Sequence, residues 1–557
     1  MALPARGFKP LSARCANGRP TWRRSPSRRG LFARRRIGMP IALPTRGKAI
    51  VTARLSKMPA VQGATLIAIA VLAVGLRLRH AGTSMAFDEM ASLYFSGQSW
   101  RHLWGWWMLR ETNPPLFYSL LKGWRMVVPM GHWAMRALPL GIAFATLAVF
   151  GRFLRTRLGW SAALLGLLLC AVSASDIYQA DYLRGYGLAR LAVLISFIGL
   201  LDALDTGRGW LVYIAGAVVA IYCHTTMVLW PVIATLAAIA DAAVRRDWRW
   251  RQIGMLLAAD IATAVLSAWV LIVALAQLKS ASAANITWLE QLGWSDFGAT
   301  CKLQLLTGGT AGSVMMAGYM LIGAWRGRRI RAVRLAVVIV IATLVLFKAT
   351  DAVHPIVSDF TLHWCFSFTA LIAAASLAGG HGVRHYAITA LTLAGVATVG
   401  LVELLVIKPA WVPQDWRQTV RTVAAHPGAA LLASHESIGV VIEQSCLVEF
   451  GQLRCPFPLV VMADPKQTDN WAFGGYRGHL VAPGQVRAAL GHAHEVYAFS
   501  RYYYTPLEHL GLHARDWPQV YWDDGELIGP IPVHAFAAPA PYTPDPDAQY
   551  TGAPDPE

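Results

Sequence analysis

The stretch "ATLIAIAVLAVGLRLRHAGTSMAFDE", Ala64–Glu89, runs from a long apolar segment directly into two adjacent carboxylates, Asp88 and Glu89. An apolar run of this length can cross about 30 Å of hydrocarbon as a helix. Ionisable side chains at the edge of a membrane need a partner or a polar cavity. The stretch therefore predicts a membrane span that delivers two carboxylates to one face of the membrane.

The composition of the whole chain is that of a protein with many membrane spans. Of its 557 residues, 55% are hydrophobic and 15% are charged, and the mean hydropathy is +0.42. Soluble proteins carry about 25% charged residues. Apolar runs long enough to span the bilayer predict about eleven transmembrane helices, near residues 60–78, 136–151, 160–175, 187–204, 210–223, 226–243, 253–276, 310–325, 334–350, 361–379 and 386–407.

Positive charge is concentrated at the N-terminus. Residues 1–60 contain fifteen Lys and Arg and no Asp or Glu, within a net charge of +19. A basic segment beside a span is typical of a cytoplasmic anchor, which we favour over a nucleic-acid-binding arm. A second interpretation stays open, in which translation starts at Met39 or Met58, because residues 1–59 lack structural periodicity. The first span is too long for a removable signal peptide.

The connections between spans predict the orientation of the chain. The basic connections all fall on one side, as cytoplasmic loops should; they are residues 151–159, 245–251, 326–334 and 381–385. A fifth connection on that side, residues 202–209, is neutral to acidic and is the exception. The basic connections therefore put the N-terminus on the cytoplasmic side of the cytoplasmic (inner) membrane. Asp88 and Glu89, after the first span, then lie outside, and an odd number of spans also puts residues 408–557 outside.

Residues 408–557 change character. The segments 429–434, 458–463 and 495–500 have the pattern of short buried strands, and helical segments separate them. This predicts a small extracytoplasmic α/β domain over residues 408–536, followed by a disordered Pro/Ala/Asp-rich tail, 537–557. The predicted fold class is a polytopic α-helical membrane protein. Its transmembrane domain covers residues 60–407, with a first external loop at 79–135.

The cysteines predict one disulfide. Cys446 and Cys455 lie close together in the segment predicted to be outside, where the compartment is oxidising. The alternative is two unpaired thiols on separate buried segments. The other five have no motif-like spacing and are expected to stay reduced. The sequence has no CxxC motif and no Cys/His cluster, so it does not predict a structural zinc site.

Three polar clusters fall on the predicted outer face. The first is Asp88 with Glu89. The second is Glu111 with Asn113, anchored by a Pro-Pro pair. The third lies in "SASDIYQADYLRGYGLARL", residues 173–191, and comprises Asp176, Asp181, Tyr182, Arg184 and Tyr186. Each alone is equally compatible with solvated loop residues, but together they are able to line one cavity.

The order of these motifs resembles a known family. "GLRLRHAGTSMAFDEMAS" (75–92), "ETNPPLFYSLLKGW" (111–124), "MRALPLGIAF" (135–144) and "YQADYLRGYGLARL" (178–191) are similar to the polyprenyl-phosphate-sugar-dependent glycosyltransferases of the GT-C superfamily. The likeness is greatest to the bacterial branch related to protein O-mannosyltransferases and the aminoarabinose transferase of lipid A. It covers roughly residues 60–425, including "VPQDWRQTVRTV" (412–423). Two departures are Asn113, where His is commoner, and "VSDFTLHWCFSF" (357–368), which lacks an Arg-Tyr pair.

The resemblance implies an inverting transferase that moves a hexosyl or pentosyl group from a polyprenyl-phosphate donor to an extracytoplasmic glycan, lipid or protein. It points to Asp88 as the general base, with Glu89 and Glu111 nearby. Arg184 is the residue expected to recognise the phosphate, unless it only pairs with Asp181. The other expected substrate-binding residues are Asn113, Asp181, Tyr182, Tyr186, His224, Arg136 and Lys348.

Several alternatives stay open at this point. Arg136 and Lys348 could be snorkelling residues, and His224 could be a satisfied structural histidine. No cofactor is certain, although clustered carboxylates are able to hold a divalent cation. The whole chain could also be a transporter or flippase, a glycan polymerase or ligase of a different fold, or a scaffold without activity. The expected partners are the lipid-linked donor, the acceptor and the bilayer, and no nucleic acid.

Overall fold

The structure is a computed structural model, and it describes residues 45–277, 291–358, 360–407, 415–462, 480–491, 493–500, 510, 512, 518–520 and 526–536. The chain divides into two units, Met1–Pro59 and Ala60–Glu557, and the site described below belongs to the second. The predicted basic tail, residues 1–59, is described only where helix α1 (Thr45–Ala81) begins. The predicted disordered tail, 537–557, lies outside the described residues.

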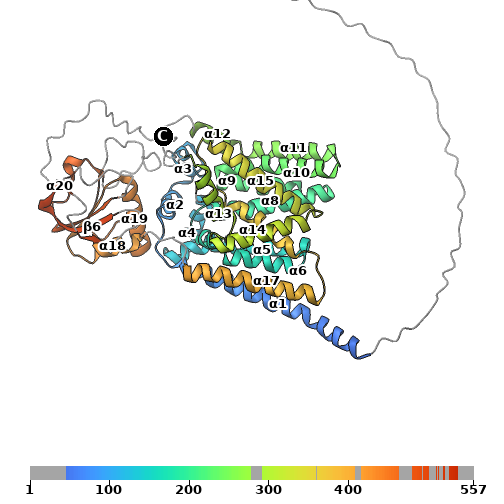
Figure 1. The fold of residues 1–557 in the computed structure, drawn as a ribbon. Helices are drawn as coiled ribbons and strands as arrows, with labels where there is room; N and C mark the ends of the chain where they lie inside the picture. Colours follow the sequence, from blue (N-terminus) through green and yellow to red (C-terminus); the bar gives the residue numbers. More distant parts are fainter. Residues whose placement is uncertain are drawn as a thin grey trace, which may run out of the picture. The chain divides into compact units, whose positions relative to one another are not determined.

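Apolar helices make up most of the second unit (Figure 1). Among the described residues, six helices are long and apolar enough to cross a membrane, or up to nine if each of three bent pairs is one span. The six are Ala60–Ala81 of α1, α5 (His132–Leu158), α8 (Tyr186–Thr206), Thr225–Arg245 of η2 (Thr225–Val228) and α10 (Leu229–Arg245), α15 (Arg331–Asp351), and Val383–Val406 of α17 (Val383–Val402) and η6 (Glu403–Ile407). The bent pairs are α6 (Trp160–Val172) with α7 (Ala174–Asp181), α11 (Trp250–Leu266) with α12 (Ala268–Gln277), and α13 (Trp294–Leu305) with α14 (Thr310–Arg326).

All eleven predicted apolar runs fall on helices, but two of these helices are short. They are α9 (Trp210–Cys223) and the segment His363–Leu377, which comprises η4 (His363–Cys365), α16 (Phe366–Ala374) and η5 (Ala375–Leu377). A straight helix needs about 20 residues to cross the hydrocarbon. Because two of the predicted spans are this short, the number of eleven spans stays a prediction. The six to nine long apolar helices among the described residues are those of a helical membrane protein.

The bend between α6 and α7 matters most for the site. The two helices meet at 69°. Ser173 stands at the break, and its hydroxyl accepts a hydrogen bond from the backbone N–H of Asp176 at 3.3 Å, which caps α7. Because α7 starts in a new direction, Tyr182 at its C-terminal end lies next to the first predicted external loop. The hydroxyl of Tyr182 donates a hydrogen bond to Asp88 there.

The first predicted external loop is itself built of short helices. They are α2 (Phe87–Gly97), α3 (Trp100–Leu103), η1 (Trp106–Arg110) and α4 (Leu116–Arg125). Helix α4 begins directly after the Pro114-Pro115 pair, because proline fits the first turn of a helix, where its missing N–H costs nothing. The loop is therefore a packed element able to hold side chains in fixed positions.

The C-terminal segment, residues 416–536, contains a six-stranded sheet. The strands are β1 (Ala429–Ala433), β2 (Leu459–Met462), β3 (Leu480–Val481), β4 (Glu495–Ser500), β5 (Gln519–Val520) and β6 (Glu526–Pro532), in the order β3-β2-β1-β4-β6-β5. The first four pair in parallel, and β6 pairs antiparallel with β4 and β5. The helices are α18 (Trp416–Ala424), α19 (Glu436–Phe450) and α20 (Val486–Ala489) (Figure 1). The three strands predicted from the sequence are confirmed as β1, β2 and β4.

Burial explains why β1 reads as an uninterrupted apolar run. Alternate residues of a strand point to opposite faces of a sheet. Leu431 and Ala433 pack with α2, α18 and α19, whereas Ala430 and Leu432 pack with α20 and β6 on the other face. A strand that is buried on both faces needs apolar residues at every position.

The disulfide between Cys446 and Cys455 is confirmed, with a Cα–Cα distance of 5.3 Å. It joins α19 to the chain that follows Gly451, whose left-handed backbone ends the helix. Among the described cysteines the others are free, as predicted: Cys170, Cys223, Cys301 and Cys365. Cys15 lies outside the described residues.

Removal of this disulfide is expected to weaken the C-terminal segment. A closed loop with a sequence separation of 9 residues constrains the unfolded chain by about 2–3 kcal/mol in the entropic model. The double variant Cys446→Ser/Cys455→Ser should therefore lose about that much free energy of unfolding, measured by denaturant-dependent proteolysis of this segment. Cys301→Ser is the matched control. Equal resistance of the double variant and wild type would contradict the prediction.

Candidate active site

Asp88 and Glu89 point in different directions because they are neighbours in the first turn of α2. Successive residues of an α-helix are about 100° apart around its axis. Glu89 turns inward, where its carboxylate accepts the backbone N–H of Ala86 at 2.8 Å and is only 1% exposed. The side chain of Asp88 is 37% exposed. Of the two carboxylates, Asp88 alone is open to a substrate.

The buried carboxylate of Glu89 is fully occupied. Arg136, from α5, donates from Nε to Oε1 at 3.0 Å and from Nη2 to Oε2 at 2.6 Å. The backbone N–H of Leu183 also donates to Oε1, at 3.1 Å. Arg136 is 5% exposed, so it does not snorkel. This pair ties α2 to α5 and to the end of α7, and neither partner is open to a substrate in this arrangement.

Arg184 joins the three clusters that were identified in the sequence. Its Nη2 lies 3.0 Å from Oδ1 of Asp88, and its Nη1 lies 3.5 Å from Oε1 of Glu111. The hydroxyl of Tyr182 donates to Oδ2 of Asp88 at 3.2 Å. The alternative that Arg184 pairs with Asp181 is therefore wrong, because both terminal nitrogens of its guanidinium face other carboxylates.

The electrostatics keep Arg184 charged. Burial works to lower the pKa of this guanidinium, but the carboxylate of Asp88 and its neighbours outweigh burial and hold that pKa above its usual range. Its Nε is buried and has no hydrogen-bond partner within the described structure. Arg184 is therefore a permanent cation, and its Nε donor has no partner among the described residues.

Glu111 is the second buried carboxylate of the group, and it orients Arg184 through Tyr118. It accepts the backbone N–H and the side-chain amide of Asn113 at 3.0 and 2.7 Å, and the hydroxyl of Tyr118 at 3.0 Å. Tyr118 in turn accepts from Nη1 of Arg184 at 2.6 Å. Burial raises the pKa of Tyr118, so its hydroxyl keeps the proton that it donates to Glu111. Asn113 thus serves Glu111 as a hydrogen-bond donor.

Aromatic rings form a stack beside Asp88. The ring centroid of Phe360 lies 4.9 Å from that of Tyr182, 5.3 Å from that of Tyr186 and 6.0 Å from that of Tyr178, with the planes within 20° of parallel. We call these four residues the aromatic ladder. Tyr118, Tyr178 and Phe360 are not among the site residues predicted from the sequence. The four-residue spacing of the three ladder tyrosines was an available signal, whereas Phe360 comes from a distant segment.

The remaining candidates are divided between this group and other contacts. Nδ1 of His224 accepts the backbone N–H of Thr226 at 3.3 Å, which caps η2, and it lies 2.8 Å from the hydroxyl of Thr226. The ring centroid of His224 lies 5.1 Å from that of Tyr186. Asp181 is buried within the field of Arg136 and, in the described residues, forms no ion pair. Lys348 bonds the carbonyl of Leu292 and pairs with Asp351 at 3.7 Å.

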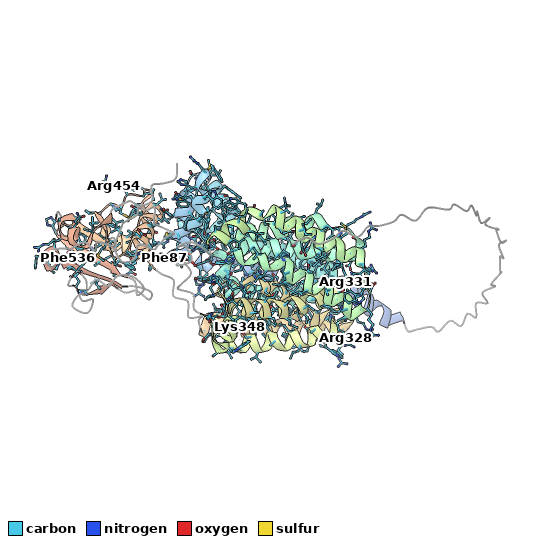
Figure 2. All side chains as sticks on the ribbon, turned by 90° about the horizontal axis from the view of Figure 1, so that it is seen from above. Phe87, Arg328, Arg331, Lys348, Arg454 and Phe536 are labelled. Carbon is cyan, nitrogen blue, oxygen red and sulfur yellow. A yellow bond between two sulfur atoms is a disulfide. The ribbon has the colours of Figure 1, made fainter. Side chains whose placement is uncertain are left out.

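Lys348 does not join the group around Asp88. Figure 2 shows it apart from Phe87, the residue that precedes Asp88. Asp176, from the third sequence cluster, also lies elsewhere. It belongs to a second buried group, where it pairs with Arg77 at 2.8 Å, with Arg190, and with His363 at 3.2 Å. Asp176 was grouped with Asp181 because the two are close in the sequence. Its contacts with Arg77 and Arg190 are visible only in the structure.

The described residues contain no group of three or more His, Cys, Asp or Glu side chains arranged to hold a metal ion. The carboxylates near Asp88 pair with Arg136 and Arg184. Tyrosine hydroxyls also donate to two of them, from Tyr182 to Asp88 and from Tyr118 to Glu111.

Comparison with known proteins identifies the fold. No protein-family model matches the sequence, and no curated protein matches it. The apo structure of ArnT from Cupriavidus metallidurans is similar, with a TM-score of 0.53 and 13% identity over 85% of this chain and 98% of ArnT. The same protein bound to undecaprenyl phosphate gives a TM-score of 0.52 and 13% identity, over 84% and 98%.

A more distant match is the oligosaccharyltransferase AglB from Archaeoglobus fulgidus, with a TM-score of 0.43 and 10% identity over 79% of this chain and 70% of that one. At 13% identity, the likeness to ArnT shows the fold alone, so this chain has the fold of ArnT. This agrees with the fold that the motif resemblance implied.

Proposed function

We propose that this protein is an inverting glycosyltransferase that moves a sugar from a polyprenyl-phosphate donor to an acceptor outside the cytoplasmic membrane. The observation that carries the proposal is the meeting of Asp88, Glu111 and Arg184 at one place. They come from three separate segments of the chain. The likeness of fold to ArnT, one structure of which holds undecaprenyl phosphate, supports a lipid-linked donor.

Asp88 is the proposed general base. Its carboxylate is the exposed one, and Tyr182 and Arg184 fix its two oxygens. The acceptor hydroxyl gives its proton to Asp88 as its oxygen attacks the anomeric carbon. The bond from that carbon to the phosphate oxygen breaks on the opposite face, and polyprenyl phosphate leaves. One in-line displacement inverts the sugar carbon.

Arg184 is the proposed contact for the donor phosphate. Its charge persists at any physiological pH, and its Nε is a buried donor that lacks a partner in the described structure. Leaving such a donor unsatisfied costs about 1–3 kcal/mol, so a phosphate oxygen that reached it would gain by binding. Glu111, Asn113 and Tyr118 hold the guanidinium in place.

The aromatic ladder is the proposed wall for the sugar or the first prenyl units. Tyr182 belongs both to the ladder and to the hydrogen bonds of Asp88. A flat aromatic surface beside the base would orient the anomeric carbon toward the acceptor. Proximity and orientation of this kind account for a large part of enzymatic rate enhancement.

The direct test is transfer by the purified protein in liposomes. Two polyprenyl-phosphate donors, one of a hexose and one of a pentose, carry the radiolabel in the sugar. They are supplied with an extract of cell-envelope lipids and glycans as acceptor. We expect release of unlabelled polyprenyl phosphate and label in the acceptor. A parallel sample with EDTA tests for a divalent cation. Movement of the labelled lipid across the bilayer without sugar transfer would instead support a flippase.

The proposal includes an orientation, with the N-terminus cytoplasmic and the C-terminal segment outside the inner membrane. A reporter that is active only in the cytoplasm, fused after residue 480, should be silent if this is correct. A fusion within the basic connection 326–334 should be active and is the control. Activity of the fusion after residue 480 would reverse the orientation.

A further inference from the structure

The loop that leads to Asp88 is held by two arginines, one from α5 and one from α18. This α1–α2 loop comprises residues 82–86. From α5, Arg136 donates to the carbonyl oxygens of Thr83 and Ser84 at 2.9 and 3.0 Å. From α18, Arg417 donates from Nη2 to the carbonyl of Gly82 at 2.9 Å, and its backbone N–H donates to the hydroxyl of Ser84 at 3.2 Å.

Arg417 is itself fixed by Glu449 of α19. Its Nε donates to Oε1 of Glu449 at 2.8 Å, and His132 Nε2 lies 2.6 Å from the same oxygen. Arg421 donates to the other oxygen at 2.8 Å. Burial works to raise the pKa of Glu449, but the hydrogen bonds from Arg417 and His132 outweigh it and hold that pKa below its usual range. Glu449 is therefore an anion at neutral pH.

Apolar packing reinforces the same connection. Trp416, the neighbour of Arg417, is completely buried. Its ring centroid lies 6.3 Å from that of Phe87 and 4.9 Å from that of Phe499 in β4. Phe87 directly precedes Asp88. Phe87, before Asp88, thus packs against the C-terminal segment. Glu89, after Asp88, pairs with Arg136 of α5.

We propose that Arg417 is a positioning residue for Asp88, so that the C-terminal segment is a working part of the active site. The inference rests on the proposed role of Asp88 as the base. Arg184 and Tyr182 contact the carboxylate of Asp88, but the position of its backbone depends on the loop that precedes it. Displacement of a catalytic group by about 1 Å can cost about 10²-fold in rate.

The test compares Arg417→Met with Arg421→Met in the liposome assay. Both changes remove a partner of Glu449, but only Arg417 touches the α1–α2 loop, and the side chain of Arg421 is 63% exposed. We expect Arg417→Met to lower kcat by about 10-fold to 10²-fold and to leave the KM for the donor within about 2-fold, since the phosphate contact at Arg184 is untouched. Arg421→Met should behave as wild type.

Arg417→Lys provides a second variant in case Arg417→Met fails to fold. Lysine keeps the charge, but it lacks the planar fork that reaches Gly82 and Glu449 together. Its kcat should lie between those of wild type and Arg417→Met. A kcat equal to wild type in both Arg417 variants would overturn the inference.

A double variant separates positioning of the base from a general structural role. If Arg417 acts through Asp88, then adding Arg417→Met to Asp88→Asn should leave the residual rate unchanged, because residues that act as a unit are not additive. A further fall by the same factor as in the single variant would overturn the inference. Full activity of Asp88→Asn alone would instead overturn the proposed function.

Discussion

Asp88→Asn is expected to lower the rate of sugar transfer by at least about 10²-fold, because general-base catalysis contributes about 10²–10⁴-fold. Asparagine keeps the shape of the side chain. Its amide oxygen can still accept from Arg184, and its NH2 group can donate to the hydroxyl of Tyr182. It cannot take the proton of an acceptor hydroxyl. The measurement is kcat in the liposome assay, with the amount of folded protein determined alongside.

The controls for this prediction come from the same chain. Asp296, an exposed carboxylate near the start of α13, is the matched site for an Asp→Asn change and should tolerate it. Asp88→Glu keeps a carboxylate but moves it by one methylene, so it should retain intermediate activity. Near-normal transfer by Asp88→Asn would show that Asp88 is not the base.

Arg136→Met is expected to destabilise the protein by about 3–5 kcal/mol, because it leaves the carboxylate of Glu89 buried without its partner. Both side chains are almost completely buried, at 6% and 1% exposed. The same change also frees the carbonyls of Thr83 and Ser84. Thermal unfolding in detergent, together with the yield of folded protein, measures the effect.

A matched control and a double variant test the cause of that loss. Arg152 lies on the same helix and is exposed, so Arg152→Met should leave the unfolding temperature almost unchanged. Adding Glu89→Gln to Arg136→Met removes the unpaired charge and should recover part of the stability. If Arg136→Met unfolds at the wild-type temperature, the buried pair does not stabilise this fold.

The two predictions separate two carboxylates that the sequence presents as a pair. The motif Asp88-Glu89 assigns both to one site. The family resemblance points to Asp88 as the base, but the sequence gives no physical reason that separates the two carboxylates. Their positions in the first turn of α2 do so, because one faces Arg136 in the interior and the other faces Arg184 at the edge of the group. The difference in burial follows from helix geometry combined with what α2 packs against.

The sequence by itself determined the membrane class, the helical segments, three strands and the partner of Cys446, because these follow from local hydropathy, periodicity and nearness along the chain. It also marked Asp88, Glu111 and Arg184 as polar groups on one predicted face. Only the tertiary structure decided which charge meets which. Arg184 pairs with Asp88 and Glu111, Arg136 with Glu89, and Arg417 holds the loop that leads to Asp88. These ion pairs and hydrogen bonds join residues up to 335 positions apart. Contacts over such separations depend on how helices pack, which no local pattern encodes.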